Sequence, residues 1–207
     1  MNKFLIVLTA SLLSACVGGA RNAPTLVIYD FGLPAARLVS DGTWSRLALE
    51  VRSPPWFDSL NIDYRLAYED PLKQREYAAS RWAGAPGALL AQRLRQQLGM
   101  ASASGNMATD CLLRVELQEF SQVFDSPQQS RGVLQGSVSL IDAKRQLVAE
   151  RPVSIEKPSV TADAHGAVNA LVAASTELGL KMADWLASLE QTSAFKSCRA
   201  TQVPAAR

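Results

Sequence analysis

Between residues 113 and 156 the sequence alternates apolar and polar residues in three successive segments, a pattern typical of β-strands with one buried face. The first segment carries its apolar residues on one face, at Leu113, Val115 and Leu117. Beyond Glu119 the apolar positions move to Phe120 and Phe124, which predicts a β-bulge near Gln118. A chain with this pattern must cover the apolar face of a sheet with a second layer.

The two other segments, residues 132–142 and 147–156, continue the sheet, with the turn sequence DAKRQ between them. Leu134, Val138 and Leu140 share one face of the earlier strand. In the later strand, Pro152 cannot donate a ladder hydrogen bond. We therefore expect the 147–156 strand to lie at an edge of the sheet.

Two amphipathic helices are available to form the second layer. The longer, residues 163–189, has an apolar stripe at helical spacing: Val168, Leu171, Val172, Leu178, Met182, Trp185, Leu186 and Leu189. The shorter covers residues 86–98, begins at a proline and ends before Gly99. Core packing against the sheet explains the stripe of residues 163–189 better than a cofactor-binding surface does.

The N-terminal half adds shorter strands over residues 25–32 and 46–52. Residues 64–68 and 76–82 are predicted to pair as a hairpin of edge strands, and the small, polar residues 101–110 are predicted to form a loop. The whole chain is therefore predicted to be a single α+β domain. It would have a mostly antiparallel sheet and two main helices, near 86–98 and 163–189.

The N-terminus has the features of an export signal. Ten mostly apolar residues, Phe4 to Leu13, follow Lys3; a signal-peptide core needs roughly 7–15 residues and a membrane-spanning helix about 20. The sequence Leu13-Ser14-Ala15-Cys16 resembles the bacterial lipobox. The resemblance implies cleavage before Cys16 and its modification with fatty acyl chains such as palmitate. An ordinary signal peptide with a chance cysteine is the alternative.

Residues 17–24, after Cys16, show no hydrophobic periodicity and are predicted to be a flexible tether. Eight such residues have an r.m.s. span of about 16 Å, which keeps the folded body close to its membrane. Val17 replaces the aspartate that retains some lipoproteins in the inner membrane, so we expect the periplasmic face of the outer membrane. The predicted division is a signal peptide at 1–15, a lipidated cysteine and tether at 16–24, a domain at 25–198 and a disordered tail at 199–207.

The chain has three cysteines, an odd number for an exported protein. If Cys16 is acylated, Cys111 and Cys198 remain, 87 residues apart. An oxidising compartment favours a disulfide between them, which would attach the C-terminal segment to the sheet. Two unpaired cysteines are the alternative.

Several functional classes find little support in the sequence. A net charge of +2 gives no reason to expect a nucleic-acid partner. His165 is the single histidine, which disfavours a zinc site, and no nucleophile stands beside it to suggest a catalytic triad. No phosphate-binding loop of the G-x-x-x-x-G-K-[ST] type is present. We therefore expect no enzymatic activity, no metal and no cofactor.

Several motifs occur in an order that resembles a known family. They are YDFG at 29–32, IDYRLAY at 62–68, EYAASRWAGAPGALLAQRL at 76–94, the strands at 113–142 and DAHGAVNALVAAS at 163–175. Together they resemble the ABC-type transport auxiliary lipoproteins, which include the paraquat-inducible protein C-like lipoproteins. The resemblance covers nearly the whole mature chain.

The resemblance implies a non-catalytic lipoprotein that serves an ABC transporter with an MCE-type substrate-binding protein. Such systems are thought to move phospholipids or other hydrophobic molecules between the two membranes. The expected partners are the membrane, through the lipid anchor, and the MCE-type periplasmic protein; self-association into a homo-oligomer is left open. A scaffold lipoprotein that braces an outer-membrane assembly is the alternative.

Docking to such a partner needs an exposed surface, and three dipeptides are candidates: Trp56-Phe57, Tyr64-Arg65 and Arg81-Trp82. The first lies in a proline-rich loop, where rigid aromatic rings can anchor a partner. In the other two, a cation stands next to a ring. The alternatives are that Trp56 and Phe57 cap the core and that the other four residues tie the hairpin to the first helix.

Overall fold

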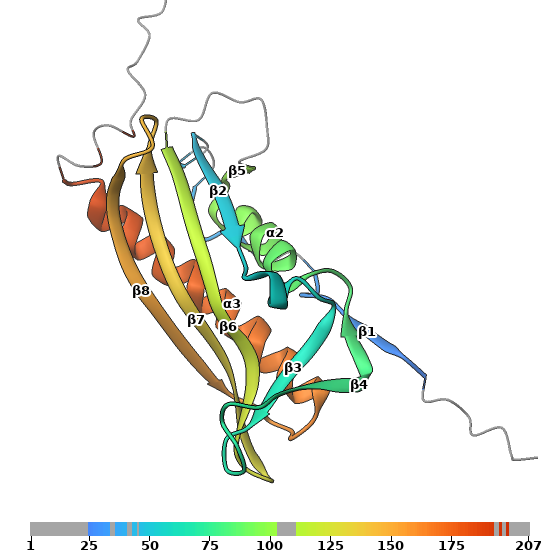
Figure 1. Cartoon of the computed structure of the whole chain (residues 1–207). Coiled ribbons are helices and arrows are strands. Elements are labelled where there is room, and N and C mark those ends of the chain that lie inside the picture. Colours follow the sequence, from blue (N-terminus) through green and yellow to red (C-terminus); the bar gives the residue numbers. More distant parts are fainter. Residues whose placement is uncertain are drawn as a thin grey trace, which may run out of the picture.

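One long strand, β6 (Cys111–Ser126), organises the sheet. The computed structural model describes residues 25–33, 36–40, 43–44, 46–102, 111–192, 195 and 198. On one side of β6 lie β7 (Gln129–Asp142) and then β8 (Leu147–Pro158), each antiparallel to its neighbour. On the other side β6 has two partners, both parallel: β2 (Leu47–Arg52) along its first residues and β3 (Asn61–Leu66) near its end (Figure 1).

Three shorter pairings complete an eight-stranded sheet. β4 (Gln74–Trp82) is antiparallel to β3, while β1 (Val27–Tyr29) runs parallel to β4. β5 (Ala101–Ser102) runs parallel to β2. The predicted α+β class is confirmed, and the sheet is mixed rather than strictly antiparallel. Alternation in a sequence marks the buried face of a strand but not the direction of its neighbours.

The predicted hairpin of β3 and β4 forms, but neither strand lies at an edge. β3 lies between β4 and β6, and β4 lies between β1 and β3. The three residues of β1 supply the edge strand. A second difference concerns residues 101–110: Ala101 and Ser102 pair with β2, and residues 103–110 lie outside the described part of the chain. The edge position predicted for β8 from Pro152 is confirmed, because β7 is the one described strand that pairs with β8.

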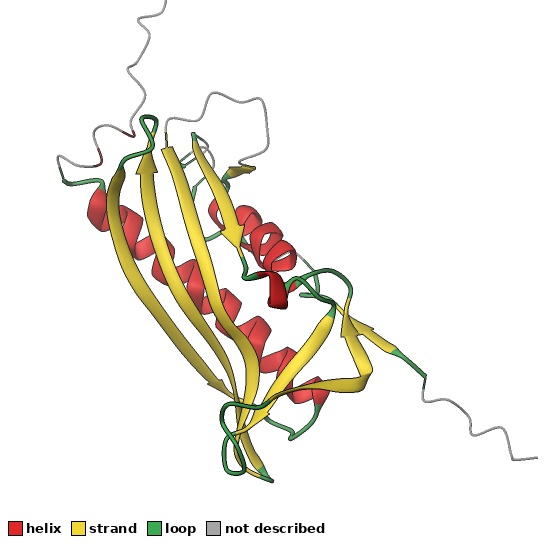
Figure 2. Cartoon of the chain, viewed as in Figure 1, coloured by secondary structure: helices red, strands yellow, loops and turns green. Residues whose placement is uncertain are grey.

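Both predicted helices, α2 (Pro86–Leu98) and α3 (Ala164–Leu189), pack on the same face of the sheet (Figure 2). α3 lies across β6, β7 and β8, whereas α2 covers β2 and contacts α3. Gly99 ends α2 in the left-handed conformation, at φ 64°. Asp163 caps α3 by accepting a hydrogen bond from the Gly166 amide at 2.8 Å.

The core lies between this helical layer and the sheet. Its completely buried leucines come from both layers: Leu90, Leu94 and Leu98 of α2, Leu113 and Leu140 of the sheet, and Leu171, Leu178 and Leu186 of α3. The opposite face of the sheet is polar, where Arg114 forms an ion pair with Glu50 at 2.8 Å. The stripe predicted for the long helix is therefore the core-facing stripe.

The predicted β-bulge near Gln118 is confirmed by a register shift between Leu117 and Glu119. Gly136 of β7 lies opposite Leu117. A Cβ atom at position 136 would stand 2.0 Å from the Glu116 carbonyl oxygen, so only glycine fits at this close approach.

A disulfide joins Cys111 to Cys198, with their Cα atoms 5.2 Å apart. Both cysteines are buried, as is Phe195. Cys111 pairs with Leu47 of β2 on one side and Asp142 of β7 on the other. The disulfide thus attaches Cys198, which follows α3, to the first residue of β6, between β2 and β7.

Candidate docking surface

The loop between β2 and β3 forms a short 3₁₀ helix, η2 (Pro55–Phe57), and separates the two rings expected to dock or to cap the core. Phe57 is buried, with 2% of its surface exposed, whereas Trp56 is 69% exposed. Successive side chains of a 3₁₀ helix point about 120° apart, so one ring can enter the core while the other faces solvent. Trp56 is therefore the ring of this pair that a partner can reach.

Tyr64 and Arg65 both connect β3 to neighbouring strands. The Tyr64 ring lies 4.7 Å from the Tyr77 ring and 5.8 Å from the Phe124 ring, measured between centroids. Arg65 forms an ion pair with Glu119 of β6, with 3.0 Å between Nη2 and Oε2. Both side chains are half-buried, and their contacts fix the place where β3 joins β6.

Arg81 and Trp82 also make internal contacts. Arg81 donates a hydrogen bond to Asn61 across the hairpin, with 2.5 Å between Nη1 and Oδ1. The Trp82 ring is 1% exposed and lies 5.5 Å from the Phe31 ring and 6.0 Å from the Phe120 ring. Trp82 also pairs with Tyr29 of β1 in the sheet, so it connects β1, β4 and β6. The six candidate residues do not form one exposed surface.

A buried polar cluster lies beneath the hairpin, at residues that are not among the candidate site residues predicted from the sequence. The Gln122 side chain is fully buried; its amide nitrogen donates to Ser130 Oγ at 2.8 Å, and its amide oxygen accepts from the Tyr77 hydroxyl. Burial raises the pKa of Tyr77 above its usual range. Gln122 stands between Phe120 and Phe124 in the inward phase of β6, so the alternation itself could have identified it.

Asp63 of β3 is also buried, with 6% of its surface exposed. Burial raises the pKa of its carboxyl group to about 6, and the nearby carboxylates of Glu119 and Glu76 act in the same direction. The Asp63 carboxylate also has a hydrogen bond to the Gln74 side chain, which lowers the pKa. Asp63 is therefore a buried acid whose pKa lies close to neutral pH.

His165 occupies the first turn of α3 and is exposed. Its ring lies 6.4 Å from the Tyr29 ring, and its nitrogens lie within 3.4 Å of the Asn169 amide nitrogen. Among the described residues no group of three or more His, Cys, Asp or Glu side chains could hold a metal ion.

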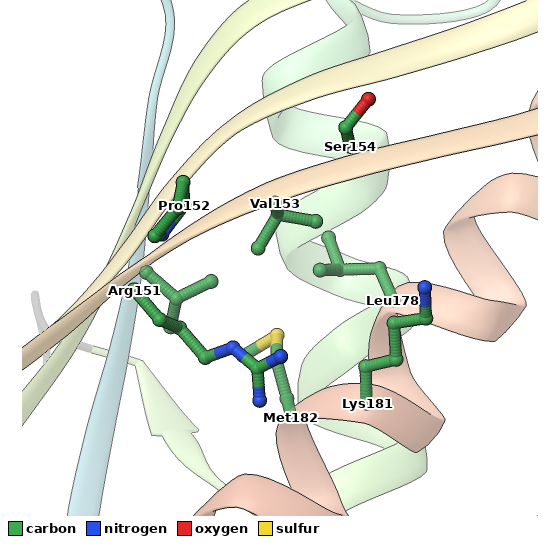
Figure 3. A pocket seen from close by; sticks show the side chains of 8 residues that line it. Arg151, Pro152, Val153, Ser154, Leu178, Lys181 and Met182 are labelled. Carbon is green, nitrogen blue, oxygen red and sulfur yellow. The ribbon is translucent and has the colours of Figure 1, made fainter.

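A small cavity of about 120 Å³ opens between β8 and α3 (Figure 3). Three buried side chains form its floor: Val138, Leu178 and Met182. Arg151 reaches from β8 toward α3, and Lys181 reaches from α3 toward β8, so two cations stand at its rim (Figure 3). No pattern in the sequence predicts this cavity, because its lining comes from three separate elements.

Comparison with protein families identifies the chain. The family described as "ABC-type transport auxiliary lipoprotein component" matches residues 29–183, which includes every described element except part of β1 and the end of α3. The chain belongs to this family. The resemblance stated from the sequence motifs is thereby confirmed. A comparison with curated proteins finds no match.

Solved structures share the fold of this auxiliary lipoprotein. A Xanthomonas campestris protein of family DUF330 is 17% identical, with a TM-score of 0.64 over 80% of this chain and 97% of that one. An uncharacterized protein is 19% identical, with a TM-score of 0.60 over 78% of this chain and 99% of that one. At these identities the likeness shows the fold alone.

The lipobox and Cys16 lie outside the described residues, as do the proposed tether at 17–24 and the tail at 199–207. Within the described part of the auxiliary lipoprotein, no helix combines the length and the apolar character needed to cross a bilayer.

Proposed function

We propose that this auxiliary lipoprotein is anchored by acylated Cys16 in the outer membrane, facing the periplasm. There it would serve, without catalysis, an ABC transporter with an MCE-type protein that moves phospholipid or other hydrophobic molecules. The observation that carries the proposal is the family match over residues 29–183 in a chain with a lipobox-like sequence at residues 13–16. The proposed organisation is a signal peptide at 1–15, a tether at 16–24, a domain at 25–198 and a tail at 199–207.

The free energy of membrane binding supports an anchor with several acyl chains. Each buried CH₂ group contributes about 0.8 kcal/mol, and a single acyl chain gives only marginal binding, whereas several chains hold stably. A tether of about 16 Å keeps the domain near its own membrane. An inner-membrane transporter must therefore reach it through an elongated partner.

The proposed contact with that partner is centred on Trp56. Its ring is exposed on a rigid Pro54-Pro55 turn, and its neighbour Phe57 is anchored in the core. A large ring that is already held in place loses little conformational freedom on binding. The internal contacts of four other candidate residues would hold in place the hairpin that follows this loop: Tyr64, Arg65, Arg81 and Trp82.

The anchor is tested with Cys16→Ser and Val17→Asp, each compared with the wild type by fractionation of the two membranes. Cys16→Ser should leave an uncleaved or soluble precursor, because the acylated sulfur is lost. In an enterobacterial-type envelope, Val17→Asp should keep the protein acylated but retain it in the inner membrane. Normal processing and attachment of Cys16→Ser would contradict the lipoprotein assignment.

The transport role is tested by deletion of the gene, alone and together with the gene of the MCE-type partner. Each single deletion should sensitise the outer membrane to detergent, and the double deletion should be no worse than either. A Trp56→Ala variant should reproduce part of the defect, while Trp56→Tyr, which keeps an aromatic ring, should restore function. Strictly additive defects would instead support a scaffold role, and turnover of a substrate by the purified protein would contradict the non-catalytic role.

A further inference from the structure

The edge strand β1 and the residue before it present three successive apolar side chains to solvent. Leu26 is 47% exposed, Val27 43% and Ile28 63%. Edge strands are commonly protected by charged residues, by proline or by being short. β1 has the sequence Val-Ile-Tyr, so its shortness is the one such device that it has. Shortness limits strand pairing but leaves the apolar side chains exposed, and exposed apolar surface of this kind is typical of an interaction site.

The register of β1 against β4 shows which way these side chains point. Tyr29 pairs with the buried Trp82, and the Tyr29 ring lies 6.4 Å from the ring of His165 in α3. Tyr29 is therefore on the side of the helical layer. Because successive residues of a strand point to opposite faces, Ile28 points away from that layer. Its partner on β4 is Arg81, which lies on the same face.

Arg81 places a positive charge beside the exposed strand. In the described part of the chain its guanidinium forms no ion pair, and Nη1 donates to the Asn61 side chain. The carboxylate of Glu76, further along β4, accepts from the amide nitrogen of the same asparagine. Apolar side chains next to an arginine suit the boundary of a bilayer, where acyl chains cover the apolar atoms and the cation stays with the phosphates.

The proposed anchor would hold β1 close to such a boundary. Thr25, the first described residue, follows Cys16 by nine residues. A fully extended chain spans at most about 32 Å over that interval, and the r.m.s. span of the proposed tether is about 16 Å. β1 is the described element next to the anchor in the sequence. The membrane that carries the acyl chains is therefore within reach of its exposed side chains.

We propose that β1 is a second contact of the lipoprotein with its own membrane. Leu26 and Ile28 enter the boundary between headgroups and acyl chains, and Arg81 binds lipid phosphate. The inference rests on the proposed function, because acylated Cys16 brings β1 to the bilayer. A partner strand would find three residues to pair with and would gain few ladder hydrogen bonds. The lipid contact fixes the orientation of the domain on the membrane, and hence the direction in which Trp56 is presented.

The test places a tryptophan at position 28 of the full-length mature lipoprotein in phospholipid vesicles. Lipids brominated on their acyl chains quench tryptophan at short range, so Ile28→Trp should lose about half or more of the fluorescence that it adds to the wild type. Leu147→Trp is the matched control, because Leu147 is 60% exposed. It begins β8 at the β7–β8 turn, at the other end of the sheet from β1 (Figure 1). The fluorescence that it adds should be unchanged.

Two further variants test the charge and the native side chains. Arg81→Gln, combined with Ile28→Trp, should reduce the quenching about twofold, because it removes the cation and keeps a donor for Asn61. Without an added tryptophan, the amides of residues 25–29 in vesicles should exchange hydrogen about tenfold more slowly in the wild type than in Leu26→Ser, Ile28→Ser. Circular dichroism in detergent should show the same fold for both proteins.

Equal quenching at positions 28 and 147, or equal exchange of residues 25–29 in the wild type and the double serine variant, would overturn the proposal. Protection of these residues that appears only when the MCE-type protein is added would overturn it in favour of a protein contact. Flotation of the lipoprotein with the vesicles in a density gradient separates these results from failure of the anchor. A protein that floats in any of these cases keeps its proposed anchor, whereas one that does not float would contradict both the anchor and the contact of β1.

Discussion

The two sides of β6 are built by different means. On the antiparallel side, formed by β7 and β8, each strand follows the last through a short turn, and β7 accompanies β6 from Cys111 to Ser126. On the parallel side, formed by β1 to β5, β2 meets β6 over six residue pairs and β3 over three. On the antiparallel side, strands that follow one another in the sequence pair with each other. On the parallel side, β2 and β3 pair with β6, which comes much later in the sequence.

This difference concentrates the stability of the parallel side in a few contacts. Trp82 packs against Phe31 and Phe120, and Arg65 pairs with Glu119. α3 covers the antiparallel side along much of its length but makes only slight contact with β3. We therefore expect the parallel side to open at a lower free energy than the antiparallel side does.

The largest effect is expected from Trp82→Ala. Removal of this buried ring takes away its contacts with Phe31, which follows β1, and with Phe120 of β6, and large-to-small changes of this kind cost about 3–5 kcal/mol. Native-state hydrogen exchange should show that the amides of β3 and β4 lose protection first. The free energy of unfolding, measured with denaturant, gives the total cost.

The matched variant is Ile155→Ala, which removes a buried side chain from β8 on the antiparallel side. It should cost about 2–5 kcal/mol and affect exchange in β7 and β8. If Trp82→Ala and Ile155→Ala lowered protection uniformly across all strands, the two sides would be one cooperative unit and the comparison would fail.

The disulfide should have the next largest effect. Its loop spans 87 residues and ends at Cys111, where β2, β6 and β7 meet. Replacement of both cysteines by alanine should cost about 2–4 kcal/mol, mainly because the unfolded chain gains freedom. Reductant should lower the free energy of unfolding of the wild type by the same amount. The free energy of unfolding of the double variant should not change with reductant. An insensitive wild type would mean that the bond contributes nothing to stability.

The same division explains which parts of the fold the sequence could predict. Alternation and helical spacing predicted β6 to β8, both helices and the bulge beside Gln118, because these features repeat over many residues. On the parallel side a strand was predicted at 25–32, but not that β1 forms the edge beside β4, and β5 was predicted as part of a loop; β1 has three residues and β5 has two, too few to show a period. Among the candidate site residues, composition indicated Trp56 and Phe57 together, but only the backbone of η2 decides which ring is exposed. The β8–α3 cavity has no signal in sequence, since Val138, Arg151 and Leu178 belong to three elements.

The smallest expected effect is the pH dependence of stability due to Asp63. It tests whether the stability of the parallel side changes with pH independently of the antiparallel side. The pKa of Asp63 is raised from 3.8 to about 6 in the folded protein, first by burial. Because the folded state holds this proton more tightly than the unfolded state, the resulting stability is fully present below about pH 4 and is lost as the pH rises through 6. A shift of about two units corresponds to about 3 kcal/mol at most.

Asp63→Asn removes the buried charge, so the variant should be more stable than the wild type at pH 7, and the difference should shrink toward pH 4. Exchange protection factors at pH 5 and pH 7 should place the change in β3 and β4, with β7 and β8 unaffected. Asp58→Asn, at an exposed position just before β3, is the control and should follow the wild-type profile. An Asp63→Asn profile parallel to that of the wild type would show that the Asp63 carboxyl group titrates alike in the folded and unfolded states. The pH response of the parallel side would then have to come from other groups.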